Sequence, residues 1–186
     1  MDIPYVTEKI KDRIIALDIE TTGYSKGDRN RIIQVGVVEY NNGKFVREYS
    51  KMFGGGKSTS QCLSVHHITD DMRYGLKPFE DCCKKLSKYL SDSVIVGHNV
   101  VSCDMRIINE YMNELGFEIV NYRMIDTYKL AKKVLTIDKY NLENCCKILG
   151  IDFGNHDALG DAKSSLMVLD QIIKRRNSFD KDYFFV

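Results

Sequence analysis

Two acidic side chains close an apolar segment near the N-terminus. Asp18 and Glu20 follow the apolar run 14–17 and lead into the polar turn 21–23. Residues two apart on a strand lie on the same face, so the two carboxylates are expected to project together. Each negative charge raises the pKa of the other, and a nearby cation removes that conflict. Because Mg²⁺ prefers carboxylate oxygen, the pair is a candidate metal site, with a solvated turn as the alternative.

Two further acids stand near the expected starts of helices. Asp104 follows the segment Gly97-His98-Asn99, which ends a second apolar run. Asp161 comes five residues after His156, among small residues that leave room for a ligand or metal. Taken alone, Asp104 is also typical of an ordinary helix N-terminus, where the helix dipole favours negative charge. For the third segment, the alternative is that Asp157 is the N-terminal helix acid and His156 a solvated loop residue.

The first third of the chain is predicted to form strands at residues 13–20, 31–40 and 44–53. Asn41-Asn42-Gly43 is typical of a hairpin turn, because Asn and Gly tolerate positive φ. Three consecutive strands imply an antiparallel meander. Residues 54–61 are expected to form a flexible loop.

Helical spacing of apolar residues begins at Pro78 and then alternates with shorter apolar runs. This alternation after a meander predicts an α/β or α+β sheet with helices packed on it. The predicted elements are a helix from 78 to about 90, a strand at 93–99, a helix at 103–115, a strand at 118–124, and helices near 126–134, 141–149 and 157–176.

Composition places bounds on the function. The chain has 186 residues, which favours one domain over residues 1–186, and its net charge of +1 gives no general attraction to nucleic acid or membrane. No run of 18 apolar residues and no apolar signal segment occur, so a cytoplasmic or nuclear setting without a membrane partner is expected. The six cysteines have poor spacing for zinc and are interpreted as small core residues in a reducing compartment.

The ordered combination of these acids resembles one enzyme family. LDIETTG, VGHNVVSCDMRII and HDALGDA are similar to the three motifs of the DEDDh branch of the DEDD superfamily of 3′→5′ exonucleases, which is DnaQ-like and ribonuclease H-like. Weaker landmarks follow the same order in VHHIT, MIDTYKLAKKV and YNLENCCKILGI. The resemblance covers about residues 13–173. Two departures stand out: Asp104 lies six residues after His98, where many members have five, and His67 replaces a usual glycine.

This resemblance implies a ribonuclease H-like mixed sheet with antiparallel N-terminal strands, flanked by helices. It also implies a metal-dependent exonuclease that hydrolyses phosphodiester bonds at 3′ ends and releases nucleoside 5′-monophosphates. His156 would be the general base, since imidazole titrates near neutrality. The implied ligands of two Mg²⁺ or Mn²⁺ ions, which also form the catalytic set with His156, are Asp18, Glu20, Asp104 and Asp161. By analogy with the family, Asp18 would bridge the two ions.

Substrate contacts follow from the same resemblance. Ile68 is a candidate for stacking against a terminal base. His98 is interpreted as a structural hydrogen-bonding residue. The predicted substrate-binding residues are Thr21, Thr22, Gly23, His66, Ile68, Thr69 and Asn99.

Three functions remain open at this stage. The first, which is favoured, is an exonuclease acting on single-stranded DNA ends in proofreading or repair, with a polymerase or another replication or repair protein as partner. The second is a 3′→5′ exoribonuclease that trims RNA. The third is a non-catalytic nucleic-acid-binding module on the same fold, since a fold alone does not establish activity.

Overall fold

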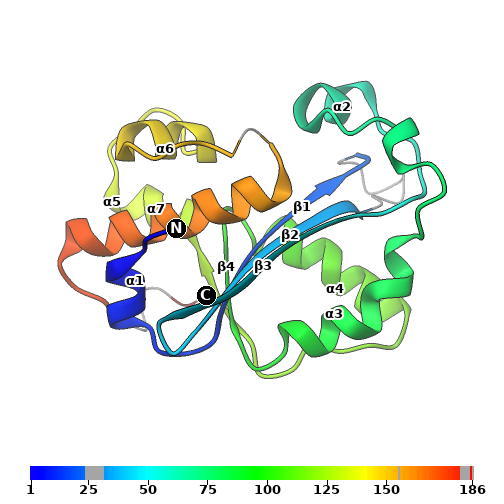
Figure 1. Ribbon diagram of the computed structural model, residues 1–186. Coiled ribbons are helices and arrows are strands. Elements are labelled where there is room, and N and C mark those ends of the chain that lie inside the picture. Colours follow the sequence, from blue (N-terminus) through cyan, green and yellow to red (C-terminus); the bar gives the residue numbers. More distant parts are fainter. Residues whose placement is uncertain (24–31, 155, 181–184, 186) are drawn as a thin grey trace.

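A mixed five-stranded sheet forms the centre of the computed structural model, which describes residues 1–23, 32–154, 156–180 and 185 (Figure 1). The strand order is β3-β2-β1-β4-β5. β1 pairs antiparallel with β2 and parallel with β4, and β5 continues the parallel half. The strands are β1 (Ile14–Thr21), β2 (Ile32–Asn41), β3 (Lys44–Met52), β4 (Val94–Gly97) and β5 (Arg123–Asp126).

The N-terminal meander confirms the predicted antiparallel strands, apart from residue 31, which lies outside the described residues. Asn42 and Gly43 have φ values of 48° and 74°. Two consecutive residues with positive φ form the tight hairpin that Asn and Gly allow, and this hairpin fixes the register between β2 and β3.

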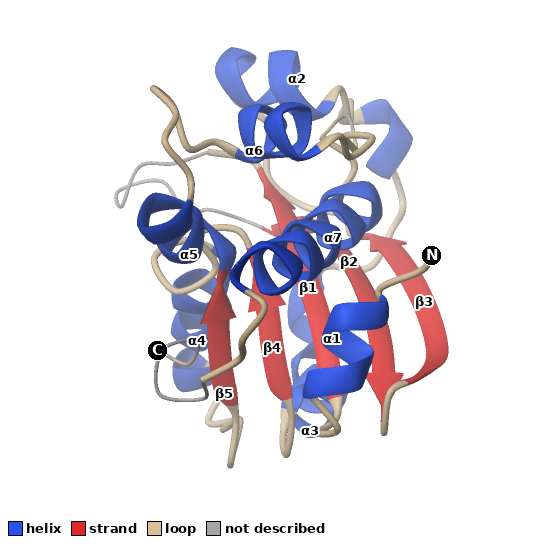
Figure 2. Cartoon of the chain, turned by 90° about the vertical axis from the view of Figure 1, so that its left-hand side faces the viewer, coloured by secondary structure: helices blue, strands red, loops and turns tan. Residues whose placement is uncertain are grey.

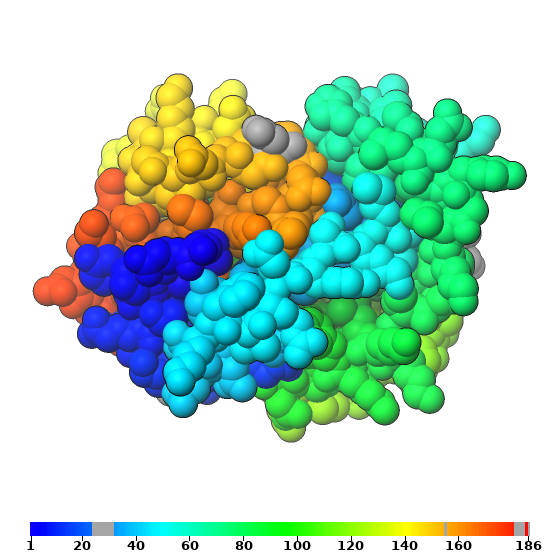
Figure 3. All heavy atoms as spheres, viewed as in Figure 1, coloured from blue at the N-terminus to red at the C-terminus, as the bar shows by residue number. Residues whose placement is uncertain are grey.

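Helices cover both faces of the sheet (Figure 2). In the space-filling view, dark blue N-terminal residues lie against the orange and red residues of the last helix (Figure 3). No helix in the described part of the chain is both long and apolar enough to cross a membrane. One face carries α1 (Pro4–Lys9), α5 (Thr127–Val134), α6 (Leu142–Leu149) and α7 (Ala158–Arg176), the other carries α3 (Cys83–Leu90) and α4 (Asp104–Glu114), and α2 (Ser60–His66) lies near the end of β1.

β1 separates the two apolar cores. Ile14 and Ala16 pack in the core under α7, whereas Ile15 and Leu17 pack in the core under α3 and α4. All four side chains are buried, as expected of a central strand covered on both faces. The alternation continues to Asp18, which therefore points toward the α7 face.

α7 approaches the sheet closely at a glycine. Gly36 of β2 pairs with Asp18 of β1, and a Cβ built on Gly36 would lie 2.2 Å from the carbonyl carbon of Ala158. No side chain fits at position 36. Because glycine has no side chain, the backbone at the start of α7 can lie directly on β2. The first turn of α7 is thereby brought to the acidic end of β1.

Four elements differ from the sequence expectations. α1 was not predicted, because six residues are too few to show helical periodicity, and it is held by Asp170, whose carboxylate accepts a hydrogen bond from Val6 N at 2.8 Å. The expected loop at 54–61 gives way to α2 at its end, since the Thr59 hydroxyl caps the helix by accepting from Cys62 N. The predicted helix at 78–90 begins as a 3₁₀ turn, Phe79–Cys82.

The fourth difference concerns β5. The strand predicted at 118–124 was misplaced, because the structure has it at Arg123–Asp126. The Val120 carbonyl accepts a hydrogen bond from Asp92 N instead of joining the sheet. The shift places Asp126 at the end of β5, beside the end of β4.

The six cysteines are all free thiols. Cys62, Cys83, Cys145 and Cys146 are buried, which confirms the interpretation of these four as core residues. Cys82 is half-buried, and Cys103, just before Asp104, is exposed, so the core interpretation was wrong for Cys103.

Substitution of Gly36 tests the close approach of α7. Gly36→Ala is expected to lower the free energy of unfolding by about 2–3 kcal/mol, in the upper range for overpacking, because the conflicting atoms belong to the backbone. Gly116→Ala is the control: nothing lies within 4 Å of its Cβ, and its positive φ alone should cost about 1 kcal/mol. Urea denaturation measures both, and equal losses would contradict the close approach.

Candidate active site

Three of the predicted acids meet at the end of β1. Asp18, Glu20 and Asp161 each offer one carboxylate oxygen, and these oxygens all lie within 4.8 Å of one another. Asp18 and Glu20 share the α7 face of β1, and Asp161 comes from the first turn of α7. Asp18 and Asp161 are 143 positions apart in the sequence, and the end of β1 and the start of α7 bring them together.

The start of α7 is fixed against β2 by polar contacts. The Asp157 side chain caps the helix by accepting from Gly160 N at 3.1 Å, as expected of an N-terminal helix acid. Gln34, which pairs with Glu20 in the sheet, donates from Nε2 to Asp157 Oδ1 at 2.8 Å and accepts from Ala158 N at 3.3 Å. These bonds fix the first turn of α7 against β2. Asp161, which lies in that turn, is thereby held beside Glu20.

Asp104 reaches the same region from the opposite side of β1. It begins α4, is 5% exposed, and accepts a hydrogen bond at Oδ1 from Ile19 N at 3.0 Å. Its carboxylate lies outside the group of three acids described above, although its charge acts on Asp18. Asp104 is therefore a fourth carboxylate near the site. It is bonded to the backbone of Ile19, the residue between Asp18 and Glu20.

The local electrostatics are strongly unfavourable for four carboxylates without a cation. Burial raises the pKa of Asp18 well above its usual range, and the charges of Asp104, Glu20 and Asp161 raise it further. Burial and the Asp161 charge raise the pKa of Glu20 to about 8. Burial likewise raises the pKa of Asp104 and that of Asp161 to about 7, although a backbone hydrogen bond opposes the rise in each case.

The donor set fits a hard divalent cation. Asp161 Oδ1 is a buried oxygen that has no hydrogen-bond partner among the described residues, so it is free to bind a metal. The converging ligand atoms are all carboxylate oxygens, which Mg²⁺ and Mn²⁺ prefer. A cation would also remove the mutual repulsion that raises these pKa values.

His156 stands beside the acids at the solvent side. Its Nδ1 lies 3.8 Å from Asp161 Oδ2, and 44% of its side chain is exposed. The backbone at His156 has a φ of +57°, and its ring meets Phe153 edge-on, with centroids 5.1 Å apart. The imidazole is thus oriented by an aromatic neighbour while one side stays open to solvent.

The residues predicted to bind substrate fall into two neighbouring segments. Thr21, Thr22 and Gly23 are buried at the end of β1, where the Thr22 carbonyl accepts from Thr59 N at 2.8 Å. That bond ties the start of α2 to β1. In Figure 3, the cyan and green residues around α2 lie beside the orange start of α7.

The second segment follows the end of α2. His66 is buried and accepts from Ile68 N at Nδ1, at 2.9 Å, and burial lowers the pKa of His66. Ile68 is only 5% exposed, whereas Thr69 is exposed. His67 adopts a left-handed φ of 57° as the C-cap of α2, a conformation that the glycine usual at this position would adopt without strain.

Asn99 and His98 belong to the turn between β4 and α4. Asn99 is half-buried, has a φ of +60°, and donates from Nδ2 to Cys103 Sγ at 3.0 Å. His98 makes hydrogen bonds to Thr127 Oγ1 at 3.0 Å and to the Tyr140 carbonyl at 2.7 Å. Both ring nitrogens of His98 are therefore engaged in structural contacts, as predicted.

Three positioning residues escaped the sequence reasoning. Gln34 and Gly36 interrupt the apolar run of β2, and a lone glycine in a strand is a signal of close backbone approach. Asp126 precedes Thr127 at the start of α5, a capping position. Each signal was present, but none says which distant residue is held.

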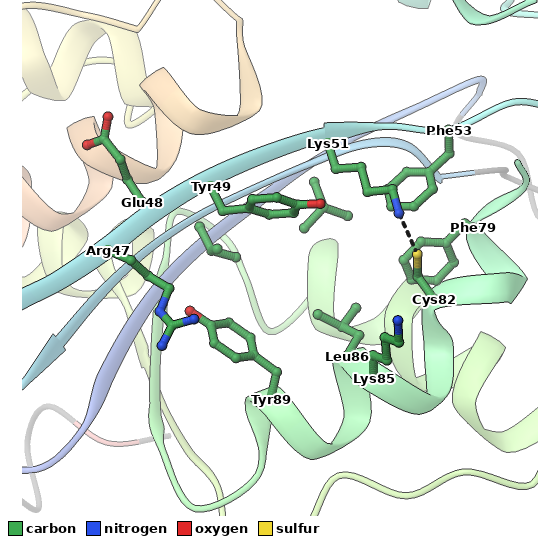
Figure 4. Close-up of a pocket in the computed structure, with 12 residues that line it drawn as sticks. Arg47, Glu48, Tyr49, Lys51, Phe53, Phe79, Cys82, Lys85, Leu86 and Tyr89 are labelled. Carbon is green, nitrogen blue, oxygen red and sulfur yellow. Dashed lines mark hydrogen bonds between the residues drawn. The ribbon is translucent and has the colours of Figure 1, made fainter. Parts of the chain in front are cut away.

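A separate cavity of about 470 Å³ lies between β3 and α3, on the face of the sheet opposite α7. Tyr49, Lys51, Cys82 and Tyr89 project into it from the two sides, and Lys51 Nζ donates to Cys82 Sγ at 3.1 Å (Figure 4). None of the predicted site residues lines this cavity.

The fold matches solved exonucleases. The structure described as Exonuclease X in complex with 5′ overhanging duplex DNA aligns with a TM-score of 0.68 and 24% identity, over 90% of this chain and 93% of that chain. E. coli Exonuclease I in complex with a dT13 oligonucleotide aligns with a TM-score of 0.76 and 15% identity, over 89% and 42% of the two chains. The mixed sheet flanked by helices is therefore a ribonuclease H-like α/β fold, as predicted.

Sequence comparison identifies the family. Residues 15–169 match the RNase_T family, described as exonuclease, and the chain belongs to this family. This result confirms the resemblance to DnaQ-like exonucleases that the motifs indicated. The exonuclease family is metal-dependent, in keeping with the acid cluster.

Curated relatives extend the comparison. DNA polymerase III PolC-type of Thermotoga maritima is 30% identical over 156 residues, 83% of this chain, and the chain spans 11% of that relative. DNA polymerase III subunit epsilon of Treponema pallidum is 28% identical over 153 residues, covering 80% of this chain and 70% of the relative. The 3'-5' exonuclease DinG of Bacillus subtilis is 25% identical over 168 residues, with 89% and 18% coverage.

The raised pKa values predict how stability depends on pH without metal. These carboxyls have unfolded-state pKa values of about 4, so between about pH 4 and pH 8 the folded state binds protons that the unfolded state has released. Stability in EDTA is therefore expected to fall as the pH rises from about 5 to about 8. Thermal unfolding measures it, and Mn²⁺ should raise the Tm most at the higher pH.

Asp18→Asn provides the matched control. Removing one buried charge is expected to raise the Tm in EDTA at the higher pH, flatten the pH dependence and weaken the response to Mn²⁺. In EDTA, the Tm of the wild type should fall further with rising pH than the Tm of Asp18→Asn. Equal falls would contradict the proposed repulsion among the buried carboxylates.

Proposed function

We propose that this protein is a metal-dependent 3′→5′ exonuclease that acts on single-stranded DNA ends and releases nucleoside 5′-monophosphates. The observation that carries the proposal is the convergence of Asp18, Glu20 and Asp161 within 4.8 Å, beside His156, in a chain of the exonuclease family. The direction and substrate are supported by relatives named as 3'-5' exonuclease and polymerase subunit epsilon, and by a structural neighbour bound to a dT13 oligonucleotide.

Asp18, Glu20, Asp104 and Asp161 would together hold two Mg²⁺ or Mn²⁺ ions. When bound, the ions supply charge stabilisation for the phosphate and acidify water. The residues of the chain fix where the cations can bind, and Asp104 is itself fixed by the Ile19 N–H.

His156 would remove the proton from the attacking water. Its ring is half-exposed and lies beside Asp161, so it faces both the acid cluster and the solvent from which the water comes. The contact with Phe153 limits the orientations of the ring. The unprotonated nitrogen of a neutral imidazole can accept this proton.

The terminal nucleotide would lie between the end of β1 and the segment that follows α2. Backbone groups at Thr21, Thr22 and Gly23 form one wall, and Thr69 is the exposed member of the second segment. Asn99 would approach from the β4 side. Ile68, being almost fully buried, would present only its edge to a stacked base.

A polymerase, or another replication or repair protein, is the proposed partner. The relatives include PolC-type polymerases, of which this chain corresponds to about a tenth, and an epsilon subunit. The free state of all six cysteines supports a reducing compartment, cytoplasmic or nuclear.

Hydrolysis of matched oligonucleotides tests the proposed substrate. DNA and RNA strands labelled at the 5′ end, incubated with Mg²⁺ or Mn²⁺, should yield a ladder that shortens from the 3′ end, faster for DNA, and EDTA should stop it. Release of nucleoside 5′-monophosphates is checked by chromatography. Faster digestion of RNA would favour the exoribonuclease, and shortening from the 5′ end would contradict the direction.

Loss of the imidazole tests the general base. His156→Ala is expected to reduce kcat by about 100-fold or more while the protein stays folded, because proton transfer contributes at least that factor. Lys163→Ala is a control on the same helix, since Lys163 pairs with Glu48 on the surface. Undiminished kcat in His156→Ala would rule out this role.

A further inference from the structure

Asp126 is a buried carboxylate that no part of the proposed reaction uses. It ends β5, is 1% exposed, and receives hydrogen bonds from four backbone N–H groups. Tyr128 N and Lys129 N donate to Oδ1 at 3.0 and 3.3 Å, which caps helix α5. The other two donors belong to a different element, so capping alone does not account for the site.

The second pair of donors comes from the turn between β4 and α4. Asn99 N donates to Asp126 Oδ1 at 3.0 Å, and Val101 N lies 3.4 Å from Oδ2. The carboxylate therefore joins the first turn of α5 to the turn that leads into α4. Buried N–H groups that lose their acceptor are costly, so this turn depends on the carboxylate.

A short chain of hydrogen bonds links this turn to Asp104. The Asn99 carbonyl accepts from Cys103 N at 3.0 Å, and the Val100 carbonyl accepts from Met105 N at 2.9 Å. Asn99 has a left-handed φ of +60°. This backbone conformation costs free energy in a residue other than glycine, so the turn depends on contacts from the surrounding structure. Asp104 follows directly and presents its carboxylate to the end of β1.

We propose that Asp126 is a positioning residue for the acidic site: its carboxylate holds the 99–103 turn and thereby sets where Asp104 meets the metal. The inference rests on the proposed function, because it assigns Asp104 to the metal-binding set. Residues behind metal ligands orient them, and their loss typically weakens metal binding or activity by about 10–100-fold.

A neighbouring residue offers a matched control. Thr127 is fully buried, follows Asp126 directly, donates from Oγ1 to the Gly97 carbonyl at 3.2 Å, and contacts His98. It supports the same region but makes no bond to residues 99–103 in the described structure. Thr127→Val therefore removes buried hydrogen bonds without releasing the turn that precedes Asp104.

Direct measurement of Mn²⁺ binding tests the proposal without relying on turnover. Electron paramagnetic resonance of the free ion is recorded during titration of the wild type, Asp126→Ala, Asp126→Asn and Thr127→Val, with circular dichroism to verify folding. Asp126→Ala is expected to bind Mn²⁺ about 10–100-fold more weakly and to lose kcat with little change in KM. Asp126→Asn keeps the Oδ1 acceptor and should stay within about 3-fold of the wild type, and Thr127→Val should bind as the wild type does.

Wild-type Mn²⁺ affinity in folded Asp126→Ala overturns the proposal, as does an equal loss in Thr127→Val. If Asp126→Ala does not fold, Asp126→Glu replaces it. A positioning role predicts that Asp126→Asn, which keeps the shape of the side chain, binds Mn²⁺ more tightly than Asp126→Glu, which keeps the charge but moves it. The reverse order also overturns it. A wild type that binds Mn²⁺ but degrades no nucleic acid would defeat the exonuclease proposal while leaving the one on Asp126 standing.

Discussion

Repulsion among buried carboxylates is the constraint on which this structure depends. Asp18, Glu20 and Asp161 converge within 4.8 Å, Asp104 acts on Asp18 from the other side, and burial makes each charge more costly. A chain would gain stability by separating these groups, yet the fold forces them together. Burial and neighbouring negative charges raise the pKa values of all four acids, and a bound cation would offset this cost.

The fold opposes this repulsion with contacts that cannot easily relax. Gly36 lets the start of α7 lie on the sheet, and Gln34 bonds it there through Asp157 and Ala158. On the other side, the Ile19 N–H holds Asp104. Asp161 and Asp104 are therefore positioned by hydrogen bonds and close packing of the surrounding residues, despite the repulsion from the other acids, which fits a site that is formed before a ligand binds.

The sequence predicted the parts of this arrangement that depend on local periodicity. The two-residue spacing of Asp18 and Glu20 fixes a shared face once β1 is a strand, and Asp157 marks the start of α7. Contacts between distant segments could not be read in the same way. α1 is held by Asp170 far along the chain, β5 begins at Arg123 because Val120 bonds elsewhere, and the position of Asp104 depends on a turn held by Asp126.

The proposed activity requires that the acids at the end of β1 bind a cation. Crystals grown with saturating Mn²⁺ test it most directly, because anomalous scattering locates the ion without reference to activity. We expect a strong anomalous peak beside the carboxylate oxygens of Asp18, Glu20 and Asp161, with a second peak toward Asp104 when a nucleotide is present. An ordered site whose carboxylates enclose no anomalous peak at saturating Mn²⁺ would contradict it.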